Sequence, residues 1–449
     1  MKQKQDTMNL TAGDPLRQIL LFALPLVSGT LFQQLYSFAD TVIVGRCLGV
    51  DALAAVGTTY SLGFLTLGFV QGACVGFGIP VAQSYGADDP EALHRYFWNG
   101  VWLCAGLSAL LACAMTALAV PLLRLVQTPA DILTLAAAYV RVIFLGIPAT
   151  VLYNFSAGVL RSVGDSRHPF YFLLFSSALN IALDYLFIVP LAMGVAGAAA
   201  ATVLSQLVSG LLCVWQLTRR TAVFRFRREE LAPSAGHLGR LCAIGLPMGF
   251  EYSVSAIGAV VMQSAINTLG ATAMAAQTAG EKIRQMFTLP MESVGMAMAT
   301  YAGQNYGARR FDRIRQGIKS GLCIQITYSA CAWAAIFLLK RPLVYLVLGE
   351  TASPTALGAV RYLTLISTLF AIHGSLMIFR NVLQGLGYSV HAILSGVGEL
   401  LGRSLGGWLA VATAAGFTAI CFANPLAWGF ALCYCVAAVR HFLRRLERG

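Results

Sequence analysis

The chain has 449 residues, of which 57% are hydrophobic and 11% are charged, with a formal net charge of +12 at pH 7. Soluble domains carry about 25% charged residues, so one aqueous core cannot hold this much apolar surface and we expect an integral membrane protein. The apolar runs are long and continuous, which favours helices over barrel strands. The basic residues lie in short loops between these runs, which argues against nucleic acid as a partner.

Runs of about 20 apolar residues, the length of a helix that crosses a bilayer, predict about twelve spans. The first run follows a polar N-terminus and lacks a small-residue cleavage site, so we expect it to be retained as the first span. Several runs exceed what a bilayer requires, which predicts tilted or kinked helices. In chain order the predicted spans are 16–44, 53–82, 97–120, 132–159, 169–191, 195–217, 238–269, 271–302, 318–339, 357–383, 390–413 and 416–442.

The sequence contains an internal repeat. VAQSYGA at 81–87 returns as GQNYGA at 303–308, and two further landmarks recur at a similar offset. The matching residues are Pro25 and Pro247 (247 − 25 = 222), Gln83 and Gln304 (304 − 83 = 221), and Gly164 and Gly387 (387 − 164 = 223). In a very apolar chain, two fused copies of one unit are typical of a secondary transporter.

The placement of basic residues predicts the topology. Arginines and lysines crowd one set of loops and the C-terminal tail, so we expect both termini in the cytoplasm and the protein in the cell (inner) membrane. The longest hydrophilic stretch lies where the two copies meet. We therefore predict an N-lobe at 1–217, a cytoplasmic linker at 218–237 and a C-lobe at 238–449. Six spans per copy give parallel repeats, related by an axis along the membrane normal.

These residues together resemble the MATE (multidrug and toxic compound extrusion) family over nearly the full length. The resemblance rests on the LP pairs of the first and seventh spans, SFADTVIVGRCLG, VAQSYGA, GQNYGA, GVLRSVGDSRHP and MAMATYAGQNYGA. It implies an all-α polytopic membrane protein with twelve transmembrane helices in two six-helix lobes that form a V. It also implies export of drug-like, often cationic, organic compounds in exchange for protons or sodium by alternating access. The details look closest to the DinF-like branch.

Polar residues inside the first six spans predict an ion-coupling site. Ionisable groups at membrane depth are costly and mark transport sites by default. Asp40 lies late in the first span, while Asn180 and Asp184 share one helix face at i, i+4. Two adjacent carboxylates in a low dielectric cannot both ionise cheaply, which suits proton exchange, and their oxygens also suit sodium. The family resemblance implies that Asp40, Asn180, Asp184 and Thr202 form the cation-coupling site.

Other polar residues near this set are predicted to bind substrate, and two prolines to act as hinges. Pro25 and Pro247 each remove a helical hydrogen bond at matching repeat positions. Alternative interpretations are an interfacial Asp40 wetted from outside, and a structural polar network that joins spans 1, 5 and 6. The predicted substrate-binding residues are Gln33, Gln34, Tyr36, Asn154, Gln206 and Glu251.

The second six spans differ in their charged residues. Other branches of the family pair a glutamate at the position of Glu251 with an aspartate in span 10, but residues 356–390 contain no Asp or Glu. His373 could relay protons there, although packing is the more common role of a lone histidine. Glu399 and Arg403, at i, i+4, are predicted to neutralise each other inside the lobe. The mixed-charge group around Glu281 is likewise expected to pair internally.

Two motifs of metal-dependent hydrolases and nucleotide-binding proteins are absent: the chain has no HExxH and no P-loop. We therefore expect a transporter without a cofactor, whose coupling ion is a proton or sodium, and which can act as a monomer. The alternative in the same superfamily is a lipid-linked precursor flippase, which would need a large cationic cavity, whereas most arginines here lie in loops. A polytopic membrane enzyme is the third hypothesis.

Overall fold

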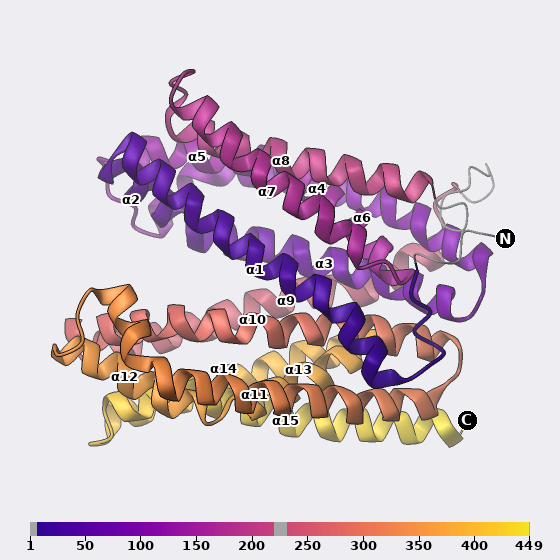
Figure 1. Cartoon of the computed structure of the whole chain (residues 1–449). Coiled ribbons are helices and arrows are strands. Elements are labelled where there is room, and N and C mark those ends of the chain that lie inside the picture. Colours follow the sequence, from indigo (N-terminus) through magenta and orange to yellow (C-terminus); the bar gives the residue numbers. More distant parts are fainter. Residues whose placement is uncertain (1–6, 220–230, 449) are drawn as a thin grey trace. The chain divides into compact units, whose positions relative to one another are not determined.

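The structure, a computed structural model, describes residues 7–219 and 231–448, and within these ranges the chain is helical with no strand. Most of the predicted linker, residues 220–230, lies outside the described residues. Figure 1 labels the helices along the chain. They are α1 (Pro15–Leu48), α2 (Val50–Thr58), α3 (Tyr60–Gly86), α4 (Pro90–Leu125), α5 (Leu133–Leu145), α6 (Ile147–Ser162), α7 (Arg167–Ile188), α8 (Gly194–Thr218), α9 (Ala235–Asn267), α10 (Ala271–Gly307), α11 (Phe311–Leu348), α12 (Pro354–Ser367), α13 (Phe370–Gly385), α14 (Ser389–Ala412) and α15 (Phe417–Arg448).

These helices confirm the predicted all-α polytopic membrane fold. Among the described residues, eight helices are long and apolar enough to cross a membrane, and the bent pairs α5–α6 and α12–α13 raise the number to ten. The two other predicted spans coincide with α10 and α14, which are long enough but carry charged residues. The predicted span 53–82 is divided at Thr59, where the Thr58 and Thr59 hydroxyls donate to the carbonyls of Ala55 and Val56 and compete with the helical ladder.

The helices form two compact units. Of the described residues, the first unit contains 7–9, 28–219 and 231–249, and the second contains 10–27 and 250–448. Membership therefore changes inside α1 and inside α9, in each case two residues after a proline, Pro25 or Pro247. The compact units follow from contacts between helices, whereas the predicted lobes follow from where the sequence repeat begins. The lobe boundaries at 217 and 238 therefore stay a prediction.

The backbone reproduces the sequence repeat. Left-handed residues recur at the repeat offset: Gly49 (φ 88°) matches Gly270 (φ 89°), and Gly164 (φ 88°) matches Gly387 (φ 87°). The turn after each YGA motif even places a non-glycine residue in this region, Asp88 at φ 55° and Arg309 at φ 54° in the described chain. A left-handed residue other than glycine is uncommon, so its recurrence at the same turn supports duplication of one unit.

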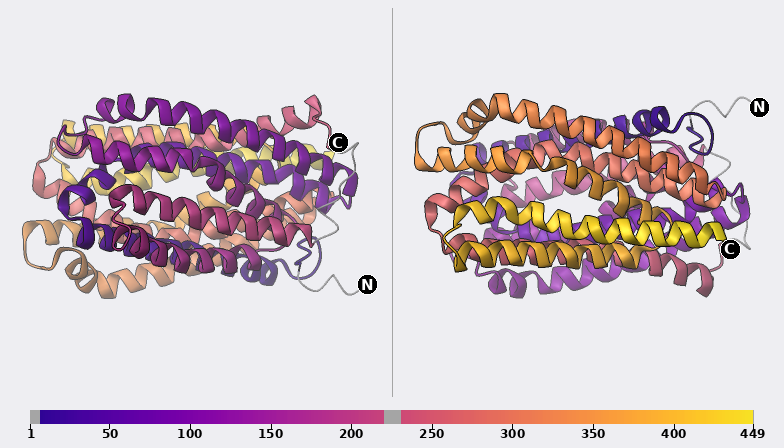
Figure 2. Two further views of the ribbon diagram at one scale, coloured as in Figure 1. Left: turned by 90° about the horizontal axis from the view of Figure 1, so that it is seen from above. Right: turned by 90° about the horizontal axis from the view of Figure 1, so that it is seen from below.

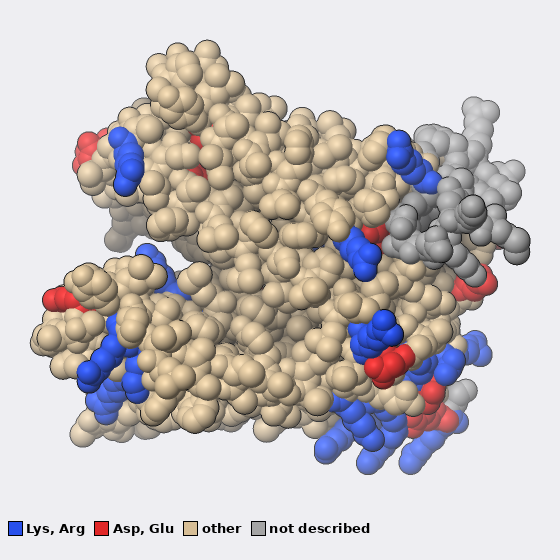
Figure 3. Space-filling view, in the orientation of Figure 1, with Lys and Arg blue, Asp and Glu red and all other residues tan. Residues whose placement is uncertain are grey.

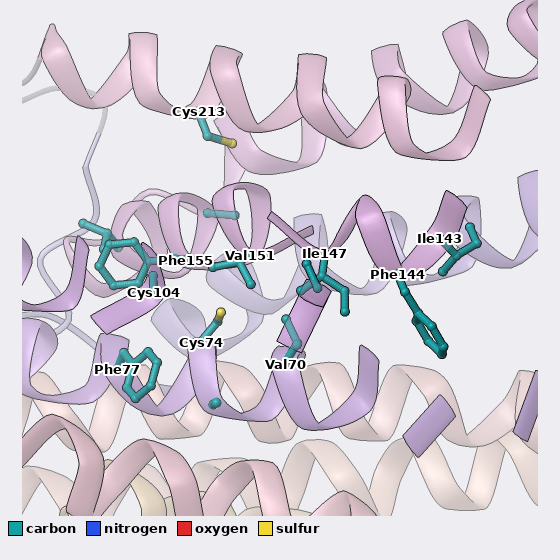
Figure 4. Packing of buried hydrophobic residues seen from close by; sticks show 14 of the residues in the cluster. Val70, Cys74, Phe77, Cys104, Ile143, Phe144, Ile147, Val151, Phe155 and Cys213 are labelled. Carbon is teal, nitrogen blue, oxygen red and sulfur yellow. The ribbon is translucent and has the colours of Figure 1, made fainter. Parts of the chain in front are cut away.

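Helix packing is repeated as well. In the first unit α7 packs on α8, α3 on α6 and α6 on α8; in the second, α14 packs on α15, α10 on α13 and α13 on α15. The views of Figure 2 show these neighbours side by side within each unit. Both units contain a helix broken near its middle, α5–α6 bent by 43° and α12–α13 bent by 52°. The first unit's core fills the space around this break with buried side chains such as Val70, Phe144 and Phe155 (Figure 4).

Glycines allow α3 and the first half of α9 to approach closely within the first unit. Gly72 and Gly76 are spaced i, i+4 on α3, and Gly245 and Gly249 have the same spacing on α9. A Cβ atom on Gly76 would lie 2.5 Å from the Cα of Gly245, and one on Gly249 would lie 2.8 Å from the carbonyl oxygen of Phe69. Small residues at this spacing are typical of tight helix pairs in membranes.

Candidate functional site

The first unit brings three of the four predicted cation-coupling residues into one polar cluster. Asp40 projects from the second half of α1, and Asn180 and Asp184 project from one face of α7. Asp184 is fully buried, Asn180 is nearly so, and Asp40 is half-buried. The spacing of Asn180 and Asp184 explains their common direction, because residues four apart lie on the same helix face.

The carboxyl groups of Asp40 and Asp184 face each other closely enough to interact. Two carboxylates offer no hydrogen-bond donor, so they can bond each other only when one of them carries a proton. One oxygen of Asp40 and both oxygens of Asp184 have no protein hydrogen-bond partner, and neither polar atom of the Asn180 amide has one. Unpaired buried polar groups are costly, so this cluster has the features of a site that receives a proton or a cation.

Two tyrosines complete the surroundings of the carboxyl pair. Tyr36 on α1 lies near both carboxyl groups. Tyr139 on α5 also lies near Asp40 and Asp184, and was not predicted from the sequence. The only available signal was a phenol inside an otherwise apolar run, which is also common in ordinary packing.

Thr202 and the predicted substrate-binding residues lie in a different arrangement. The Thr202 hydroxyl donates to the carbonyl of Ala198 in its own helix, at 3.2 Å. Asn154 donates to the carbonyl of Thr150 (2.8 Å), and the Thr150 hydroxyl donates to Oε1 of Gln206 (2.5 Å), which links α6 to α8. Thr150 was missed because a threonine in an apolar helix usually bonds to its own backbone. Gln33 and Gln34 lie exposed on α1.

The second unit holds a network of four charged side chains. Arg380 on α13 contacts Oε1 of Glu251 (3.1 Å) and also donates to Glu399, whose second oxygen accepts from Arg403 (2.9 Å). Gln384 donates to the second oxygen of Glu251 (2.8 Å). The predicted Glu399–Arg403 pair is confirmed. The sequence did not indicate Arg380 as the partner of Glu251, because the family pattern has a second acid within 356–390 and Arg380 is a base.

Other charged residues of the second unit also pair as expected. Arg284 donates to Glu281 at 2.8 Å, and the Tyr362 hydroxyl donates to the same carboxylate at 2.5 Å. His373 is buried with its ring 4.7 Å from that of Trp428, and its Nε2 is 4.0 Å from the carboxylate of Glu292. Among the described residues, no hydrogen bond or ion pair joins His373 to Glu251, and a proton-relay role for His373 stays a prediction.

Comparison with known proteins identifies the family. The MatE family model matches residues 25–186 and 247–399, two segments that begin at the paired prolines. The chain is 29% identical over 378 residues to the probable multidrug resistance protein YoeA of Bacillus subtilis, covering 83% of this chain and 81% of that protein. It is 32% identical over 307 residues to the probable multidrug resistance protein YpnP of the same species, covering 68% of each.

Solved structures show the same fold. The outward-facing conformation of a multidrug resistance MATE family transporter of the MOP superfamily matches with a TM-score of 0.92 at 24% identity, covering all of both chains. A crystal structure of MATE in the bent conformation matches with a TM-score of 0.91, covering 98% of each chain. The family match extends over most of the chain and over both copies of the repeat, and the chain therefore belongs to the MATE family of membrane transporters.

Proposed function

We propose that this protein exports drug-like, often cationic, organic compounds in exchange for protons or sodium by alternating access. Its relatives named multidrug resistance proteins support efflux as the activity. The observation that supports ion coupling is the polar cluster of the first unit, in which Asp40, Asn180 and Asp184 keep unpaired polar atoms within helices that are long and apolar enough to cross a membrane. Oxygen-rich, unpaired sites suit both a proton and a hard cation such as sodium.

The mechanism follows from charge. With no ion bound, two carboxylates at close range repel each other in a low dielectric, and uptake of one proton or one sodium ion relieves that repulsion. Ion binding therefore favours a conformation in which Asp40 on α1 approaches Asp184 on α7. We propose that Pro25 lets α1 bend in response, since an interior proline removes one helical hydrogen bond, and that Pro247 allows the equivalent bend in α9.

Substrate contacts are proposed for polar side chains beside this cluster. Gln33, Gln34 and Tyr36 lie on the same stretch of α1 as Asp40. Gln206 of α8 accepts from Thr150 of α6, and Asn154 donates to the Thr150 carbonyl within α6. Amides and phenols can accept or donate hydrogen bonds to many ligands, which suits a site without a single substrate. The substrate-binding role of Glu251 stays a prediction; its carboxylate is bonded to Arg380 and Gln384.

Orientation is proposed from the basic residues. Lysines and arginines gather at the end of the second unit where α11 begins and α15 ends, visible at the lower right of Figure 3. Arg315 of α11 pairs with Glu447 of α15 at 2.6 Å, so these two helix ends are adjacent. A concentration of basic residues at one end supports a cytoplasmic location for that end and for the C-terminus.

The test is transport in proteoliposomes with proton and sodium gradients imposed separately. Asp40→Asn keeps the shape of the side chain but removes its ability to bind and release a proton or to neutralise sodium. We expect gradient-driven efflux of a fluorescent organic cation to fall to the rate of empty liposomes. Asp51→Asn, an exposed position in the first turn of α2, serves as the matched control. Efflux that persists unchanged in Asp40→Asn would refute the proposed mechanism.

A further inference from the structure

Every carboxylate oxygen in the second unit's network already has a partner. Glu251 accepts from Arg380 and Gln384, and Glu399 accepts from Arg380 and Arg403. Glu251, Glu399 and Arg380 are each less than 10% exposed. Two glutamates and two arginines sum to zero net charge, so this buried network is neutral and closed without any added ion.

The first unit is arranged in the opposite way. Asp184 is fully buried and Asp40 half-buried, and in the described chain neither forms an ion pair with a guanidinium or ammonium group. The nearby amide of Asn180 has no hydrogen-bond partner. The repeat relates the two sites directly, because the offset of 223 residues that joins Gly164 to Gly387 places Asn180 opposite Arg403 (180 + 223 = 403). Where the first copy has a neutral amide and an open site, the second copy has a fixed cation.

We propose that Arg380 is a tethered cation that fills the place of a coupling ion in the second unit and thereby restricts ion exchange to the first unit. The inference rests on the proposed function, in which a cation neutralises the carboxylates of a unit. Arg380 bridges the two glutamates through its two terminal nitrogens, as a bound ion would bridge them. The guanidinium is covalently attached and keeps its proton, so during a transport cycle it can neither leave the site nor lose its charge.

If Arg380 acts through its charge, its removal has a consequence that would not follow if it only filled space. Removing the positive charge of Arg380 leaves two glutamates and one arginine, a network with a net charge of −1. Breaking a buried pair by removing one partner leaves an uncompensated charge, which the protein can remedy only by taking up a cation. A second-unit ion site should therefore appear when Arg380 is neutralised, and should vanish again when one glutamate is neutralised with it.

The experiment measures thermal unfolding of the purified full-length protein in detergent, in a background of Asp40→Asn with Asp184→Asn. Adding Arg380→Met should lower Tm in alkaline, sodium-free buffer, and Tm should rise saturably with sodium chloride or on acidification, with choline chloride as the ionic-strength control. Arg380→Lys, which keeps the charge, should show neither response. Arg380→Met combined with Glu251→Gln, which restores neutrality, should show neither response as well.

The outcomes separate charge compensation from packing. The proposal would be overturned if the Tm of Arg380→Met changed neither with sodium nor with acidification. It would also be overturned if the Tm of the variant that combines Arg380→Met with Glu251→Gln rose by the same amount. If Arg380→Met does not accumulate in folded form, the variant that combines Arg380→Met with Glu251→Gln must still fold, and its Tm must not change with sodium or acidification. Failure of both variants to fold would also overturn the proposal. Because the first-unit carboxylates are absent throughout, these results do not depend on whether Asp40 couples transport.

Discussion

The close approach of α3 and α9 in the first unit makes Gly76 a sensitive position. In Gly76→Ala the added Cβ would lie 2.5 Å from the Cα of Gly245 and 2.9 Å from the sulfur of Met248. Non-bonded carbons prefer about 3.5–4.0 Å, so the helices must separate by about 1 Å. The Met248 side chain can move, but the backbone of Gly245 cannot move alone. Overpacking of this kind costs about 1–3 kcal/mol, which lowers Tm by about 2–12 °C for a unit of this size.

A fluorogenic maleimide that reacts with thiols as they become exposed measures this unfolding, because Cys74 and Cys213 are buried in the same unit. Gly63→Ala is the matched control on α3, since a Cβ there meets nothing within 4 Å. Alanine at an unhindered helix position should leave Tm unchanged or raise it slightly. The reasoning is refuted if Gly76→Ala unfolds at or above the temperature of Gly63→Ala.

Two further predictions concern the charged and polar groups of each unit. Asp184→Asn should raise Tm in alkaline, sodium-free detergent solution, because it removes an uncompensated buried charge. Glu399→Gln should lower the free energy of unfolding by about 3–5 kcal/mol, because it leaves two arginines without their shared carboxylate. Tm shifts of the same sign in the two variants would contradict this contrast. Arg313→Ala should speed hydrogen–deuterium exchange of the peptide that contains Leu10, whose carbonyl accepts from the Arg313 guanidinium at 3.3 Å. Arg315→Ala, which removes an exposed pair on the same helix, is the control, and equal exchange in the two variants would contradict that prediction.

The repeat was predictable from sequence because it rests on residues with strong backbone preferences. Pro25 and Pro247, or Gly164 and Gly387, are visible as pairs in the printed chain, and the structure places the glycine pair in the same left-handed region. The change of unit inside α1 and α9 was not predictable in this way. It depends on which tertiary contacts each half of a helix makes, and contacts such as that of Gly76 with Gly245 connect positions that no local pattern relates.

The candidate site was predictable where a residue type is rare in its surroundings. A carboxylate inside an apolar run is unusual, so Asp40 and Asp184 stand out, and Asn180 follows from its spacing to Asp184. Tyr139 and Thr150 do not stand out, because tyrosine and threonine occur in many membrane helices without a functional role. Arg380 was missed for a different reason: the family pattern directs attention to acids, and the base that neutralises them lies among apolar residues more than 100 positions from Glu251.

The two copies therefore share a backbone and differ in where they leave charge unsatisfied. The duplicated turns and broken helices are equivalent in the two copies, but the carboxylates are not, because the repeat offsets pair Asp40 with Met262 (40 + 222) and Asp184 with Gly407 (184 + 223). In the second unit, Arg380 and Arg403 neutralise Glu251 and Glu399. In the first unit, Asp40 and Asp184 have no basic partner among the described residues. Under the proposed coupling, the free energy that this arrangement costs when empty would be recovered when a proton or sodium ion binds. Under the proposed coupling, symmetry of the fold and asymmetry of charge would confine ion exchange to the first unit.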